Sequence, residues 1–129
     1  MRLLGSDVDV RTISPLTLAF VGDAVYDLLV REMLVCEANR PVGALNDKKI
    51  KVVCCEFQSA AAKKVMPLLT EEELAAFKRG RNAHSSTVPK HASKGDYHNA
   101  TGLEALFGYL YLTEQPERIR ELFAAIQSD

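Results

Sequence analysis

The feature that most constrains the fold is a long helical pattern near the N-terminus. Ser14 followed by Pro15 is a typical helix start, with serine as the N-cap and proline at the first helical position. From there to about residue 35, apolar side chains fall on almost every side of a helix, which indicates a central buried helix. A second pattern of this kind covers about 98–113. Together they predict an all-α fold, a helical bundle around two buried central helices.

Three weaker helical segments complete the pattern. One runs from about 43 to 66 and ends before Pro67. Thr70 and Glu73 match the capping-box pattern and open a short helix to about residue 78. The last helix begins at Pro116 and reaches about residue 125. Strand signals are weak, and 129 residues suffice for one domain with a core, so we expect a single domain over 1–129.

Composition narrows the class of protein. A hydrophobic fraction of 47% and a charged fraction of 26% are those of an ordinary globular protein, and the net charge of −1 means that any basic surface must be local. The N-terminus does not resemble a signal peptide, and two aspartates interrupt the longest apolar stretch, which argues against a membrane span. Three cysteines lack metal-ligand spacing and predict packed, unpaired thiols in the cytoplasm: Cys36, Cys54 and Cys55.

Two carboxylates stand out because each interrupts an apolar helix. Asp23 lies in LAFVGDAVYD beside Gly22, and Glu104 is the only charged group in TGLEALFGYLYL, one turn from Gly108. Glycines would let the two helices cross tightly and leave the acids facing one another. Two buried carboxylates repel each other unless they share a proton or a cation, and Mg²⁺ prefers such oxygen ligands.

Two alternatives remain open from the residues alone. Asp23 could pair with a lysine or arginine from elsewhere in the chain. Thr101 and Glu104 also match the capping-box spacing, so Glu104 could close a helix N-terminus instead of binding a metal.

The same stretches resemble the ribonuclease III family. LAFVGDAVYD resembles the signature helix of that family, LEALFGYLYL resembles its second acidic helix, and FKRGRNAHSSTVPK at 77–90 resembles the basic loop of the Mini-ribonuclease III subfamily. The resemblance covers nearly all of 14–125 and places the two family acids on Asp23 and Glu104. Two further acids of the wider family are replaced here by Ala19 and Thr101, which leaves the number of bound metals open.

The resemblance implies a ribonuclease III-like endonuclease domain that works as a homodimer. It also implies Mg²⁺-dependent cleavage of double-stranded RNA, with the 23S ribosomal RNA precursor as substrate and ribosomal proteins as candidate helpers. No separate double-stranded-RNA-binding domain is expected, so the catalytic domain itself would recognise the RNA.

The segment 78–94 is the expected RNA-binding element. It carries several lysines and arginines and no acid, and most of it overlaps a loop expected over 80–97, which is longer than most connections. The residues expected to contact RNA are Lys78, Arg79, Arg81, Asn82, His84, Ser85, Thr87 and Lys90. The alternatives are a solvated loop without a partner, or arginines that pair with the nearby acids Glu71–Glu73.

These expectations give a metal-assisted phosphodiester hydrolysis. Asp23 and Glu104 would hold Mg²⁺, which polarises a phosphoryl oxygen and activates a water, and Thr101 would orient that water through its hydroxyl. The rival hypothesis is an inactive, dimeric RNA-binding or ribosome-assembly factor on the same scaffold. Retention of two acids in apolar helices favours the enzyme.

A twofold dimer is also expected from the apolar helix over 14–35. It has more apolar surface than a chain of this length can cover, and self-complementary patches commonly close by a twofold axis. The residues expected to contribute this excess apolar surface to the dimer contact are Leu18, Val21, Val25 and Leu29.

Overall fold

The computed structural model describes residues 2–83 and 93–128, and every regular element within them is helical. The elements are η1 (Val10–Thr12), α1 (Pro15–Glu37), α2 (Val42–Val53), α3 (Cys55–Val65), η2 (Met66–Leu68), α4 (Glu71–Arg81), α5 (Lys94–Leu112) and α6 (Pro116–Gln127). This confirms the all-α prediction. None of the helices in these residues is long and apolar enough to cross a membrane.

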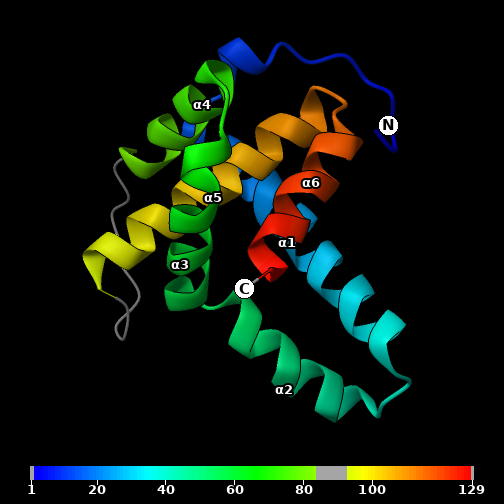
Figure 1. Ribbon diagram of the computed structural model, residues 1–129. Helices are drawn as coiled ribbons and strands as arrows, with labels where there is room; N and C mark the ends of the chain where they lie inside the picture. Colours follow the sequence, from blue (N-terminus) through cyan, green and yellow to red (C-terminus); the bar gives the residue numbers. More distant parts are fainter. Residues whose placement is uncertain (1, 84–92, 129) are drawn as a thin grey trace.

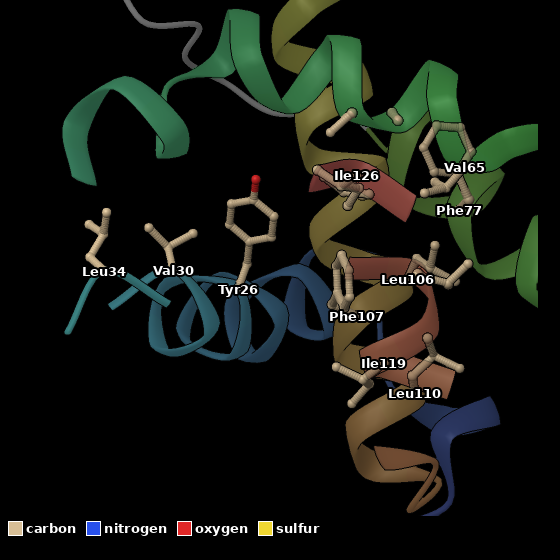
Figure 2. Close-up of a cluster of buried hydrophobic side chains, with 14 residues drawn as sticks. Tyr26, Val30, Leu34, Val65, Phe77, Leu106, Phe107, Leu110, Ile119 and Ile126 are labelled. Carbon is tan, nitrogen blue, oxygen red and sulfur yellow. The ribbon is translucent and has the colours of Figure 1, made fainter. Parts of the chain in front are cut away.

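Helix α5 is the centre of the bundle, with α1, α3, α4 and α6 packed around it (Figure 1). Its side chains are buried on several sides, so the prediction of a central helix here is confirmed. In the core, Tyr26 of α1 lies near Phe107 of α5 and Phe123 of α6, with ring centroids 5.8 and 6.0 Å apart. Figure 2 shows the buried cluster around Tyr26 and Phe107, to which α6 contributes Ile119 and Ile126, α3 contributes Val65 and α4 contributes Phe77.

Helix α1 buries only one side, so the prediction that it is buried all round is wrong for the single chain. Its buried residues follow one stripe: Leu18, Ala19, Gly22, Tyr26, Val30 and Leu34. On the opposite side Phe20 is 78% exposed and Leu28 is 64% exposed. The helix is apolar on both sides, and its neighbours in this chain cover one of them.

Local sequence signals set several helix ends as predicted. The Ser14 side chain accepts a hydrogen bond from the Thr17 amide at 3.2 Å. The capping box is complete, because Thr70 and Glu73 each accept from the other's backbone N–H. Helix α6 begins at Pro116. Each signal operates within one turn of chain, so it does not depend on the rest of the fold.

The helix expected over 43–66 is instead two helices that meet at Cys54. Cys54 has an extended backbone (φ −70°, ψ 158°), and the Gln58 side chain donates through Nε2 to the Val53 carbonyl at 3.0 Å. The break lets α2 lie along α1, where the Tyr26 hydroxyl donates to the Val52 carbonyl at 3.2 Å, while α3 packs on α5. Tertiary contacts therefore override a continuous helical pattern.

Two other expectations are corrected. Helix α5 begins at Lys94 rather than about 98, because the Ser93 side chain caps it by accepting from the Asp96 amide at 3.0 Å. Helix α4 also continues to Arg81, so the two helices take up both ends of the loop expected over 80–97.

The cysteines are unpaired as expected, but Cys36 and Cys54 are exposed rather than packed.

Candidate active site

Helices α1 and α5 cross in direct backbone contact at two glycines. A Cβ on Gly22 would lie 1.6 Å from the carbonyl oxygen of Glu104, and a Cβ on Gly108 would lie 2.0 Å from that of Leu18. No other residue type fits at either position without separating the helices. The crossing brings Asp23, the neighbour of Gly22, beside Glu104, which confirms the expected close approach of the two helices.

The two carboxyl groups meet at the edge of this crossing. Asp23 is exposed, so the expectation that it is buried is wrong, whereas Glu104 is half-buried. Burial, a hydrogen bond with Asp23 and the negative charge of Asp23 together raise the pKa of Glu104 to about 9. At neutral pH the pair therefore holds one proton. The capping-box alternative is also excluded, because Thr101 and Glu104 lie in the middle of α5 and Ser93 caps its N-terminus.

The acid pair fits a hard divalent cation. A proton held by two adjacent carboxyl groups at neutral pH occupies a place where a cation would be stabilised by the same oxygens. Within residues 2–83 and 93–128 there is no cluster of three or more histidine, cysteine or acidic side chains that could hold a metal. The two carboxylates would leave most ligand positions to water and phosphate oxygens, an arrangement that Mg²⁺ accepts and Zn²⁺ sites rarely use.

Thr101 lies one turn before Glu104 and is buried. Its hydroxyl donates to the Tyr97 carbonyl at 3.0 Å. The proton of this hydroxyl is therefore committed to the helix, and any role toward water would use its lone pairs as acceptors.

Cys55 lies within the electrostatic influence of both Glu104 and Asp96, and sequence reasoning did not connect these residues. The pKa of Cys55 is raised by burial and then by the charges of Glu104, Cys54 and Asp96. Asp96 precedes Glu104 by two turns of α5, so the four-residue spacing was a usable signal. Cys55 carried no such signal, because the break after α2 brings it there.

The basic end of α4 is held against the same part of α5. A Cβ on Gly80 would lie 2.5 Å from the Ala105 Cβ and 3.1 Å from the Thr101 carbonyl oxygen. The last turn of α4, with Lys78, Arg79 and Arg81, is therefore fixed within about a turn of Glu104 along α5. Lys78 and Asn82 are exposed. The other expected RNA contacts, His84, Ser85, Thr87 and Lys90, lie outside the described residues.

The two arginines at this end have different surroundings. Arg79 donates through Nη2 to the Ile13 carbonyl at 3.2 Å, whereas the guanidinium of Arg81 lies over the Phe77 ring, 5.7 Å from its centroid. In the described part of the chain neither forms an ion pair with the acids at the start of α4. Instead, Arg118 binds both oxygens of Glu73 at 2.8 and 2.9 Å, so the expected alternative pairing is not found.

Known proteins resemble this chain in sequence and in fold. Residues 16–115 match the family model of the Ribonuclease III domain. The Mini-ribonuclease 3 of Thermoanaerobacter sp. is 44% identical over 113 residues, covering 88% of this chain and 80% of that protein. The Mini-ribonuclease 3 of Symbiobacterium thermophilum is 43% identical over 114 residues, covering 88% of this chain and 88% of that protein. A crystal structure of a protein from Fusobacterium nucleatum has a TM-score of 0.84 at 32% identity, covering 94% of this chain and 96% of that one.

The matched segment holds the crossing of α1 and α5 with both acids, and the relatives cover most of the chain. Their similarity far exceeds what a shared helical architecture requires. The chain belongs to the ribonuclease III family and is an endoribonuclease of the Mini-ribonuclease 3 type.

Proposed function

We propose that this chain cleaves double-stranded RNA by Mg²⁺-dependent hydrolysis of a phosphodiester at the Asp23–Glu104 pair. The observation that carries the proposal is the contact between the two carboxyl groups, which raises the pKa of Glu104 to about 9. A nucleic-acid phosphate would enter from the solvent side of Asp23, which is exposed.

The residues have separate roles in this proposal. Asp23 and Glu104 would hold the cation and would give up the shared proton in exchange for it. Mg²⁺ would supply there a Lewis acid for the phosphoryl oxygen and would lower the pKa of a water. Thr101, whose hydroxyl proton is bonded to Tyr97, accepts a hydrogen bond from water and so orients it. The last turn of α4 and the segment after it bind backbone phosphates through charge, without reading bases.

The ribonuclease III family implies double-stranded RNA as the class of substrate. We take the 23S ribosomal RNA precursor as the substrate, with ribosomal proteins as candidate partners that present it. An A-form duplex exposes a wide minor groove that is recognised by shape and 2′-hydroxyl groups.

A homodimer is part of the same proposal, with a different contact surface from the one expected. Leu18 is fully buried inside the chain, and Val25 and Leu29 pack against the core. The large apolar residues of α1 that remain exposed are Leu16, Phe20, Leu28 and Val35. The first three share one face at spacings of four and eight residues, and a second copy closing by a twofold axis would cover it and place one acid pair at each strand of a duplex.

Cleavage of end-labelled duplex RNA, with Mg²⁺ or with a chelator, tests the proposal. The parent should cut the duplex only with Mg²⁺, and Glu104→Gln should not cut it. The matched control is Glu117→Gln on α6, whose carboxylate is exposed and pairs with Arg120. Retention of cleavage in Glu104→Gln, or cleavage in the presence of the chelator, would contradict the proposal.

A further inference from the structure

A second charged group lies on α1, beyond the acid pair. Asp23, Asp27 and Arg31 follow at four-residue spacing, so they lie along the same side of the helix. At 1.5 Å per residue, Asp27 and Arg31 are about 6 and about 12 Å along α1 from Asp23. Arg31 is the only basic residue of α1.

Asp27 holds two cations at once. Arg31 Nε donates to Asp27 Oδ2 at 2.5 Å, and Lys49 Nζ of α2 lies 3.3 Å from Asp27 Oδ1. Burial raises the pKa of Asp27, but the hydrogen bonds from Arg31 and Lys49 outweigh it, and the pKa is lowered. One carboxylate faces two cations, so the cluster keeps a positive charge.

The two cations border a hollow between α1 and α2. It has a volume of about 370 Å³ and an otherwise mainly apolar lining, with Asn46 beside the cations. The Arg31 side chain is 59% exposed, and among the described residues only its Nε is bonded. Its terminal nitrogens are therefore available to an anion from solvent. In Figure 1, α2 and the second half of α1 form one edge of the molecule, away from α4.

A strand bound at Asp23 can continue along α1 in two directions. Toward the N-terminus lie Leu16 and Phe20, whose apolar side chains the proposed dimer would cover and which offer no partner to a phosphate. Toward the C-terminus it meets Arg31 and Lys49. A guanidinium and an ammonium group are the usual side-chain partners of phosphate oxygens.

We propose that Arg31 and Lys49, positioned by Asp27, bind backbone phosphates of duplex RNA next to the phosphate held at the acid pair. This inference rests on the proposed function. Asp27 is a positioning residue, because it orients both cations without itself favouring an anion. The competing explanation is a purely structural cluster that ties α2 to α1.

Binding of a fluorescently labelled RNA duplex across a series of salt concentrations, with chelator present to prevent cleavage, separates the two explanations. Arg31→Gln and Lys49→Gln should each weaken binding several-fold and lower the slope of log affinity against log salt by up to about 0.9. In Mg²⁺, each should raise KM while kcat stays near the parent value. The matched control is Arg120→Gln on α6, since Arg120 pairs with the exposed Glu117. It should change neither the duplex affinity nor the salt slope.

Asp27→Asn tests the positioning role. It keeps both positive charges but removes the carboxylate that orients them, so duplex affinity should fall, by less than in Arg31→Gln, while the salt slope stays near that of the parent. In a purely structural cluster only Tm should fall, because α2 loses its ion pair to α1. The inference is overturned if Arg31→Gln and Lys49→Gln keep the affinity and salt slope of the parent. Failure of the proposed function itself would appear in the parent, as absence of duplex binding and cleavage.

Discussion

The carboxyl group of Glu104 lies against that of Asp23, and this contact together with burial raises the pKa of Glu104 to about 9. The contact exists because Gly22 lets the backbone of α1 touch the Glu104 carbonyl. A raised pKa in a carboxylate pair is a common property of functional sites, and it has measurable consequences here.

Replacement of Glu104 should stabilise the metal-free protein in a pH-dependent way. Its folded pKa lies above the ordinary value of 4.5, so the contribution of its proton to stability is complete below about pH 4.5 and is lost as pH rises toward 9. Glu104→Gln keeps a neutral group at every pH. The Tm difference between variant and parent, measured in chelator by circular dichroism, should therefore grow from pH 5 to pH 9. Glu117→Gln should show no such trend, and a constant difference for Glu104→Gln would contradict the raised pKa.

Metal binding should release a proton. At pH 7 the Glu104 carboxyl is protonated, because its pKa is about 9, so a cation bound by both acids must displace that proton. Calorimetric titration of the parent with Mg²⁺ in two buffers of different ionisation enthalpy should report about one proton released per site. Binding with no proton release would contradict a protonated Glu104 that becomes a ligand. Glu104→Gln should release none.

The glycines at the crossing of α1 and α5 should not tolerate alanine. A Cβ at Gly22 would overlap the Glu104 carbonyl oxygen, so Gly22→Ala must push the helices apart, at a cost of about 3 kcal/mol or more in the free energy of unfolding. Gly43 on α2 has nothing within 4 Å of its Cβ position. Gly43→Ala should instead add about 0.5–1 kcal/mol. Urea unfolding of the two variants compares them directly, and equal stabilities would contradict the close crossing.

The exposed side of α1 should control the oligomeric state. Phe20 is 78% exposed at the centre of its apolar face, so Phe20→Asp should convert a dimer to a monomer in multi-angle light scattering at micromolar protein. Val42→Asp is the control, since Val42 on α2 is 81% exposed and outside that face. A parent that is monomeric at this concentration would refute the dimer.

Loss of charge at the end of α4 should weaken RNA binding more than catalysis. Arg79→Ala combined with Arg81→Ala should raise KM much more than it lowers kcat, and should flatten the salt dependence of binding by about one to two units. A small fall in Tm is expected as well, because Arg79 also holds the Ile13 carbonyl. A large loss of Tm with an unchanged salt slope would make both arginines structural.

Sequence alone was sufficient at helix starts with a clear local capping pattern. Ser14 with Pro15, and Thr70 with Glu73, set helix starts through hydrogen bonds within one turn, so their positions could be predicted without the fold. The stretches around Asp23 and Glu104 predicted the close helix crossing for a related reason. Each places an acid beside or one turn from a glycine, and that spacing is a property of the chain itself.

Packing decided what the sequence left open. A helix that is apolar on both sides does not specify which side its own chain will cover, and α1 became half exposed at Phe20 because α5 and α6 lie against the other side. The break at Cys54 and the meeting of Asp27 with Lys49 likewise depend on α2 lying along α1. These contacts join residues far apart in the chain, and their free energy exceeds the weak local preference for one continuous helix. Local hydrogen bonding thus determined where helices start, and only the tertiary structure determined which of their faces remain open to substrate and partner.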